Sequence, residues 1–268
     1  MIITNPNPLN FEKSVNKIIQ DINEWFNTDL LSLNLDKTHF IHFVTKNSSS
    51  IDFNFICGNK KIANVHNTKF LGLTLDNTLS WRTDIDTIIP YISSATFALR
   101  VVKPFLSLDS LKTVFYSYFH SVMTYGLIFW GNFHYSNIIF RLQKRNIRII
   151  AAIRCRDSCR EHFKNLKILP LQSQYIYSLS LFVIDNGDYF RVNSEIHNIN
   201  KSNLHLPISN LSVCQKGTYY IGIIVFNSLP CQIKEISHNR NQFKHALKHF
   251  LYFHSFYTLD EYFNHNKI

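Results

Sequence analysis

The spacing of apolar residues changes at about residue 81, and this change limits the possible folds more than any other feature of the sequence. Before it, residues 51–57 alternate between apolar and polar side chains, as a half-buried strand does. After it, apolar residues recur every three or four positions as far as residue 254, which is the spacing of helices. The sequence therefore predicts an α+β fold that is mainly α, with a small antiparallel sheet ahead of a helical region.

The first 80 residues are expected to form one helix and that sheet. The helix is predicted over residues 11–27, with Asn10 as its N-cap. Its apolar stripe consists of Phe11, Val15, Ile18, Ile19, Ile22, Trp25 and Phe26. The strands are predicted at residues 39–44, 51–57 and 68–75, with a turn that begins at Gly58.

The rest of the chain is predicted to be helical. A long helix is expected from Trp81 to Leu99 with a bend at Pro90, and Ser107 is expected to cap the next helix. The buried stripe of that next helix is predicted as Leu108, Leu111, Phe115, Tyr118, Phe119 and Val122. Further helices are expected at residues 136–153, on both sides of Leu169-Pro170 within residues 157–186, and at residues 240–254. Residues 187–216 are predicted to be a long loop because they are rich in Asn, Ser and His and have little periodicity.

The charge of the chain favours an anionic partner. Its 268 residues include 28 Lys and Arg but only 18 Asp and Glu, and this excess favours nucleic acid before a membrane. The helix at residues 136–153 places its cations on one face and its apolar residues on the other. The cations are Arg141, Lys144, Arg145 and Arg148, and the apolar residues are Ile139, Leu142, Ile149, Ile150 and Ile153. This face could bind a polyanion, or it could be an ordinary solvated surface.

Several other kinds of chemistry find no support in the sequence. The glycine-containing motifs of serine hydrolases, P-loop proteins and dinucleotide-binding proteins do not occur. Cys155, Cys159 and His162 offer three ligands where zinc normally takes four, so we predict no metal site there. Asp84 and Asp86 are expected to point in opposite directions from one helix, which excludes a shared metal.

The cellular setting is predicted from cysteines and hydropathy. Five scattered cysteines favour a reducing compartment, either cytoplasm or nucleus, over a secreted disulfide framework. No signal peptide is predicted, and the apolar stretches at residues 122–130 and 176–184 are too short to cross a membrane. We therefore expect a soluble protein without a membrane partner.

Several short phrases occur along the chain in three ordered groups. The first group is Trp25-Phe26, Leu33-Asn34, Lys37-Thr38, Lys69-Phe70-Leu71-Gly72 and Leu79-Ser80-Trp81. The second is Tyr125-Gly126, Trp130-Gly131 and Leu142-Gln143-Lys144-Arg145 with Arg148, and the third is Ser158-Cys159-Arg160, Phe163-Lys164, Lys216-Gly217 and Phe226-Asn227. In this order the three groups resemble the end of the palm, the thumb and the tail of the reverse transcriptases of non-LTR (LINE-type, jockey-like) retrotransposons. The resemblance implies a palm remnant at residues 1–80, a helical thumb at 81–165 and a helical extension at 166–268.

The resemblance also implies roles for individual residues. Lys37 resembles a lysine that assists departure of pyrophosphate, and Lys69, Phe70, Leu71 and Gly72 resemble the hairpin that supports the primer end. Arg141, Lys144, Arg145 and Arg148 would contact phosphates of an RNA or DNA template–primer duplex. From the residues alone, Phe70, Leu71 and Trp81 are expected to lie mostly in the core.

The resemblance leaves enzymatic activity uncertain. Enzymes of this family use Mg²⁺ held by aspartates, including an Asp-Asp pair, and no Asp-Asp dipeptide occurs in this chain. We therefore predict no catalytic residue apart from the accessory Lys37 and no metal bound by this chain alone. The missing polymerase portion is a further candidate partner. The chain is expected to begin just after the catalytic turn, as a fragment inactive by itself. The alternatives are a non-catalytic basic nucleic-acid-binding module and a pseudogene product.

Overall fold

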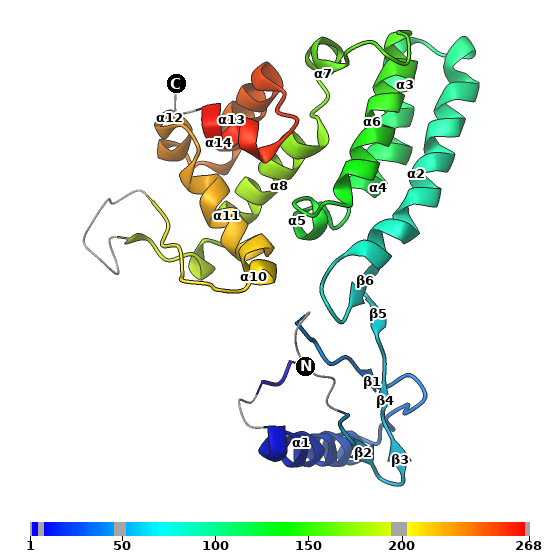
Figure 1. The fold of residues 1–268 in the computed structure, drawn as a ribbon, viewed down its shortest axis with the longest axis vertical. Coiled ribbons are helices and arrows are strands. Elements are labelled where there is room, and N and C mark those ends of the chain that lie inside the picture. Colours follow the sequence, from blue (N-terminus) through cyan, green and yellow to red (C-terminus); the bar gives the residue numbers. More distant parts are fainter. Residues whose placement is uncertain (1, 5–7, 46–51, 194–202, 266–268) are drawn as a thin grey trace. The chain divides into compact units, whose positions relative to one another are not determined.

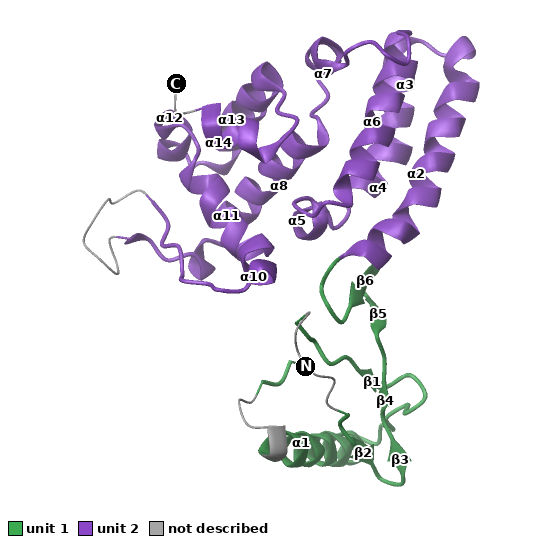
Figure 2. Cartoon of the chain, in the orientation of Figure 1, with its two compact units in different colours: residues 1–80 green, residues 81–268 purple. Residues whose placement is uncertain are grey.

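The protein is described by a computed structural model that covers residues 2–4, 8–45, 52–193 and 203–265 (Figure 1). The chain divides into two compact units, Met1–Ser80 and Trp81–Ile268, which are unit 1 and unit 2 below (Figure 2). Short strands occur in unit 1 and helices dominate the chain, which confirms the α+β, mainly α class. The residues expected to form thumb and tail belong to the same compact unit.

Helix α1 (Pro8–Thr28) covers the small apolar core of unit 1. Its residues Val15 and Ile19 are buried against Phe53, Phe55, Cys57 and Ile62. The prediction of Asn10 as N-cap is wrong because the helix begins two residues earlier, at Pro8. Trp25 is 59% exposed, so the apolar stripe is buried only in the middle of the helix.

The strands of unit 1 form three separate two-stranded ladders. Strand β1 (His39–Phe40) pairs in parallel with β4 (Ala63–Asn64), and β2 (Ile56–Cys57) pairs antiparallel with β3 (Lys60–Lys61). Strands β5 (Asn67–Phe70) and β6 (Leu73–Asp76) form an antiparallel hairpin. The prediction of small antiparallel pairing is confirmed for β2–β3 and β5–β6, whereas the β1–β4 pair is parallel. The segment predicted as one strand at 68–75 reverses direction at Leu71-Gly72.

The predicted alternation of buried and exposed side chains over residues 51–57 is confirmed in its described part. Phe53, Phe55 and Cys57 are buried, and the intervening Ile56 is exposed. Ile51, which the prediction included, lies outside the described residues.

Unit 2 begins with a group of packed helices. These are α2 (Arg82–Val102), the 3₁₀ turn η1 (Lys103–Phe105), α3 (Leu108–Val114), the π-helical η2 (Phe115–His120), α4 (Ser121–Thr124), α5 (Leu127–Trp130) and α6 (Ser136–Ala151). Helix α2 packs against η2 and α6, and Pro90 lies within it. The predicted cap is confirmed, because Ser107 Oγ accepts a hydrogen bond from the Ser110 amide.

The π-helical turn explains an error in the predicted buried stripe. Leu108 and Tyr118 are exposed, whereas residues at a strict four-residue spacing are buried. The buried residues are Leu111, Phe115, Phe119, Met123 and Leu127. An α-helical turn holds slightly fewer than four residues and a π-helical turn holds slightly more. The two offsets compensate, so residues spaced four apart stay on one side of the combined segment. The prediction assumed 3.6 residues per turn throughout.

The remaining helices of unit 2 surround α8. They are α7 (Arg160–Leu166), α8 (Leu171–Asp185), the 3₁₀ turn η3 (Gly187–Tyr189), α10 (Ser212–Lys216), α11 (Thr218–Asn227), α12 (Cys231–Glu235), α13 (Arg240–His254) and α14 (Leu259–His265). Helix α8 packs against α11 and α13. The described parts of the predicted loop at 187–216 contain η3, a β-bridge between Val192 and Leu204, and α10.

One apolar segment of unit 2 is longer than the stretches at residues 122–130 and 176–184. Residues Arg82–Phe105 are long and apolar enough to cross a membrane, by length and composition only. A mostly buried core helix passes the same test, but only 28% of this apolar window is buried, although α2 does bury Ile85, Ile92 and Leu99 within unit 2. This segment is therefore weak support for a membrane protein.

Close packing of α5 against α8 makes Gly131 sensitive to substitution. A Cβ at this position would lie 2.3 Å from Tyr175 Cδ2 and 2.8 Å from the Leu127 carbonyl oxygen. Because Tyr175 is fully buried, we expect Gly131→Ala to lower the free energy of unfolding by about 2–3 kcal/mol, as overpacked cores do. Denaturant unfolding would measure this, with Gly187→Ala as the control because a Cβ there meets nothing within 4 Å. Equal stability of both variants would contradict this packing.

Candidate nucleic-acid interface

The β5–β6 hairpin presents the residues that resemble a primer-supporting hairpin. Leu71 and Gly72 form its two-residue turn and both have positive φ, 47° and 82°, as the tight turns of hairpins require. Phe70 is 61% exposed and Leu71 is 76% exposed, and Lys69 is exposed beside them. The expectation that Phe70 and Leu71 lie in the core is therefore wrong.

Trp81 is expected in the core together with Phe70 and Leu71. It belongs to unit 2 and is buried, as expected. Its ring stacks on Phe129, with centroids 5.4 Å apart and planes 17° apart. Its role in the described structure is packing.

Asp76 organises the base of the hairpin. One of its carboxylate oxygens, Oδ1, accepts hydrogen bonds from the amides of Thr78 and Ser80 at 3.0 and 2.9 Å. The same oxygen accepts a bond from Thr78 Oγ1 at 2.6 Å, and Oδ2 accepts one from Ser80 Oγ at 3.2 Å. These bonds close a loop directly after β6, so the hairpin rests on an ordered base.

Lys37 makes no side-chain hydrogen bond or ion pair with the hairpin among the described residues. It is exposed in the turn at residues 35–37, and its backbone amide donates to Asn34. Two residues further on, His39 shares a hydrogen bond with Thr68 of β5.

The inner face of α6 is partly polar, which the sequence analysis missed. Gln143 is fully buried, and its side chain donates to the Leu169 carbonyl at 2.9 Å and accepts from the Leu171 amide at 2.8 Å. Asn146, also fully buried, donates to Thr96 Oγ1 of α2 at 2.9 Å. Their spacing from Ile139 and Ile150, three or four residues at each step, is the signal that could have placed them inside.

The predicted apolar side of α6 is only partly confirmed. Ile139 and Ile150 are buried, but Leu142, Ile149 and Ile153 are half-buried. The buried set instead includes Phe140 and Ile147 together with the polar Gln143 and Asn146. The helix is therefore rotated relative to the prediction, because its polar inner residues have buried hydrogen-bond partners.

The four predicted cations of α6 fall into two pairs. Arg141 and Arg145 are exposed, and neither takes part in an ion pair among the described residues. Arg148 is half-buried and donates from Nε and Nη2 to the Asp157 carbonyl oxygen at 3.2 and 3.1 Å. The Lys144 ammonium lies 4.7 Å from the centroid of the Phe140 ring. Of the four side chains, Arg141 and Arg145 are the most accessible to a ligand.

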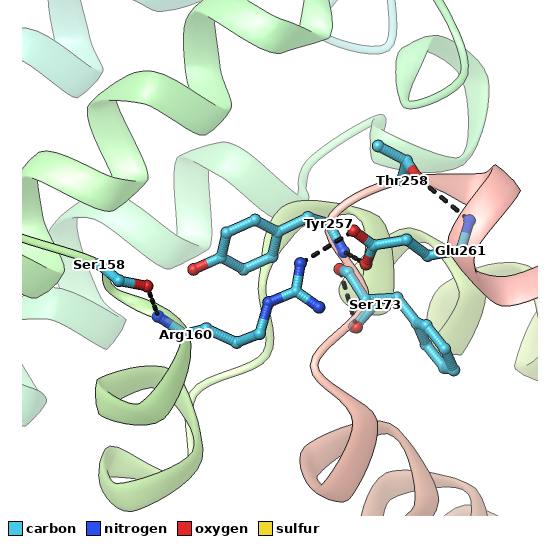
Figure 3. A network of polar contacts seen from close by, with 7 residues as sticks. Ser158, Arg160, Ser173, Tyr257, Thr258 and Glu261 are labelled. Carbon is cyan, nitrogen blue, oxygen red and sulfur yellow. Dashed lines mark hydrogen bonds and ion pairs between the residues drawn. The ribbon is translucent and has the colours of Figure 1, made fainter. Parts of the chain in front are cut away.

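A cluster around Tyr257 joins this part of α6 to the end of the chain (Figure 3). The Arg160 guanidinium lies 4.2 Å from the centroid of the Tyr257 ring, and its Nη2 donates to Glu261 Oε1 at 2.8 Å. The other carboxylate oxygen of Glu261 accepts from the Tyr257 amide at 2.9 Å. The Tyr257 ring also meets Phe140 edge to face at a centroid distance of 5.0 Å. Burial raises the pKa of the Tyr257 phenol to about 12, so this group is neutral at physiological pH.

No candidate metal centre is found in the described part of the chain. No group of three His, Cys, Asp or Glu side chains there could hold an ion. Cys155 is exposed and Cys159 is buried, and burial raises the pKa of the Cys159 thiol despite the opposing charges of Arg148 and Lys144. Asp84 is buried whereas Asp86 is exposed near Arg82, so these two carboxylates point apart.

The whole excess of positive charge belongs to unit 2. Unit 1 contains 7 Lys and Arg and 7 Asp and Glu, whereas unit 2 contains 21 and 11. Residues 141–167 alone carry nine Lys and Arg against Asp157 and Glu161. Asp157 lies 3.9 Å from Arg154 and Glu161 lies 3.3 Å from Lys164, so neither acid faces Arg141 or Arg145 as an ion-pair partner.

Comparison of this chain with models of protein families, with curated proteins and with solved structures found no match. The function is therefore argued from the residues and their arrangement alone.

The strained turn of the hairpin gives a stability prediction. A leucine in the left-handed region costs about 1 kcal/mol relative to asparagine, which adopts positive φ more readily. Because the Leu71 side chain is mostly exposed, we expect Leu71→Asn to raise the free energy of unfolding of unit 1 by about 0.5–1 kcal/mol. Leu71→Ala keeps the Cβ and should not stabilise the unit. Hydrogen exchange of the hairpin amides would measure both variants, and faster exchange in Leu71→Asn would contradict the turn geometry.

The Tyr257 cluster gives a second stability prediction. Arg160→Ala removes an ion pair and a cation–π contact, so we expect the free energy of unfolding to fall by about 1–2 kcal/mol. Arg154→Ala is the matched control, because the Arg154 side chain is almost fully exposed and should change stability by less than about 0.5 kcal/mol. Thermal unfolding of the two variants compares them. The cluster would have no stabilising role if both variants unfolded alike.

Proposed function

We propose that this chain binds an RNA or DNA template–primer duplex in the manner of the palm end and thumb of a non-LTR retrotransposon reverse transcriptase. The observation that carries the proposal is the outer face of α6, where Arg141 and Arg145 are exposed without carboxylate partners in the described structure. The order of the sequence phrases supports the choice of this family. The exposed hairpin of unit 1 supports it independently.

The duplex would be held mainly through its phosphates. Arginine presents several donors to phosphate oxygens, and each neutralised phosphate releases counterions into solution. Such contacts carry no sequence information, which suits a protein that must follow any template. Lys144 and Arg148 add to the same positive potential while their contacts to Phe140 and Asp157 hold them in place.

The hairpin would contribute through its apolar tip. Backbone strain at exposed residues is typical of functional sites, and the Phe70–Gly72 tip combines strain with large exposed side chains. Lys69 beside the tip supplies a charge for a phosphate. This arrangement fits support of a strand end, where an unstacked base and a phosphate are both available.

Catalysis is not assigned to this chain. The described residues include no set of carboxylates that fits the Mg²⁺ implied by the resemblance. We propose that Lys37 has no catalytic partner within the described chain and that any polymerase activity needs residues supplied by another portion. Binding without catalysis is also what a basic nucleic-acid-binding module would show.

The α6 face makes the binding proposal testable. Arg141→Gln and Arg145→Gln should each weaken binding of a primed RNA–DNA duplex and reduce the slope of log K against log salt by about 0.9. Lys244→Gln is the matched control, because it removes one exposed charge from α13 and should leave the slope unchanged. Fluorescence anisotropy between 50 and 300 mM KCl would measure all three. The proposal fails if the arginine variants retain the salt slope of the unsubstituted chain.

A further inference from the structure

A cavity of about 910 Å³ lies in unit 2 at the end of α8, and none of its lining residues belongs to α6. Its walls come from α8, from η3 and the residue pair that follows it, from His205, and from the first turn of α11. The side chains used below are Phe182, Tyr189, Phe190, Arg191, His205 and Tyr219. None of them belongs to the interface described above.

Aromatic rings line this cavity in a fixed arrangement. Phe190 is buried and stacks on Tyr219, with centroids 5.0 Å apart and planes 13° apart. Phe182 meets the Phe190 ring edge-on at 90° and 6.1 Å. Tyr219 is still 42% exposed and Tyr189 is 74% exposed, so both rings offer surface to a ligand. A planar aromatic ligand could extend the stack that Phe190 and Tyr219 begin.

One cationic side chain, that of Arg191, belongs to the same walls. Arg191 is exposed, and none of the ion pairs among the described residues includes it. Its carbonyl oxygen accepts a hydrogen bond from the His205 amide at 2.8 Å, next to the bridge between Val192 and Leu204. This pairing holds Arg191 and His205 side by side. Among the described residues that line the cavity there is no Asp or Glu.

Two features define the ligand chemistry: exposed aromatic surfaces for stacking, and a guanidinium that has no ion pair among the described residues. Bases of single-stranded nucleic acid bind by stacking on aromatic side chains while cations contact the neighbouring phosphate. A paired base cannot use such a site, because its two faces are covered by its neighbours in the duplex. The volume is ample for one nucleotide.

We propose that this cavity binds an unpaired nucleobase together with its adjoining phosphate, supplied by a single strand. Tyr219 and Tyr189 would stack with the base, and Arg191 would contact the phosphate. The inference rests on the proposed function only in taking nucleic acid as the partner, since the residues of the two sites are different.

The test uses the full chain and an oligothymidylate with one central 2-aminopurine, whose fluorescence falls when the base stacks. Tyr189→Ala should weaken binding of this single strand by about tenfold, as loss of one stacking partner does. Tyr91→Ala removes an exposed tyrosine from α2 and should leave binding unchanged. Tyr219→Ala should weaken binding similarly, and Tyr219→Phe should restore it, which separates stacking from loss of folding.

Arg191→Gln should reduce the salt slope for the single strand by about 0.7, whereas Lys244→Gln should not. Free AMP distinguishes two sources of the same base and phosphate: failure of AMP to displace the probe supports a single strand, and efficient displacement would overturn the strand in favour of a free nucleotide. The proposal is overturned if Tyr189→Ala and Tyr219→Ala both bind and quench like Tyr91→Ala.

Failure of this proposal can be told from failure of the duplex proposal. Arg141→Gln and Arg145→Gln should weaken duplex binding and leave quenching of the single-stranded probe intact. If quenching depends on the tyrosines but duplex binding does not depend on the arginines, the cavity proposal is supported and the α6 proposal fails. If duplex binding depends on the arginines but quenching does not depend on the tyrosines, the α6 proposal is supported and the cavity proposal fails.

Discussion

The buried side chain of Gln143 sets the rotation of α6, and the cationic surface of the protein depends on that rotation. Its amide bonds to the Leu169 carbonyl and the Leu171 amide on both sides of Pro170, a residue that has no N–H to donate. Positions two residues away on a helix point about 200° around the axis. Fixing Gln143 inward therefore turns Arg141 and Arg145 outward, and a slip in this contact would bury an arginine or leave polar groups of the core unpaired.

The end of the chain stabilises the same surface from a second direction. Tyr257 lies beside Phe140 of α6 and Phe163 of α7, and its ring faces the cations of Lys144 and Arg160. Cations gathered on one helix repel each other, and aromatic faces and carbonyl oxygens relieve that repulsion without cancelling the charge. Glu261 neutralises Arg160 alone, through the direct ion pair. The C-terminal helices thus hold these cations in place without neutralising most of them, so their positive potential can act on a ligand.

The sequence was informative where one periodicity held throughout an element. Helix α13 begins and ends where its pattern predicted, at Arg240 and His254, and the exposure of Arg141 and Arg145 follows from the pattern of α6. The π-helical turn at Phe115–His120 could not be read from a 3.6-residue period. Helix α11 has no polar face, so its ten residues give no helical periodicity and were not predicted. The exposure of Phe70 could not be predicted from its hydrophobicity, because an apolar side chain is ordinarily expected in the core.

The two units would act on a nucleic acid by different physical means. Unit 1 has no net charge and offers an exposed phenylalanine and a strained leucine at its hairpin, so its contribution would be mainly apolar contact. Unit 2 holds all of the excess charge, so its contribution would be mainly counterion release. Salt weakens the second contribution strongly and the first very little. At high ionic strength any binding that persists should therefore depend on aromatic and apolar residues, at Phe70 of the hairpin and at the tyrosines of the α8–α11 cavity, rather than on the arginines of α6.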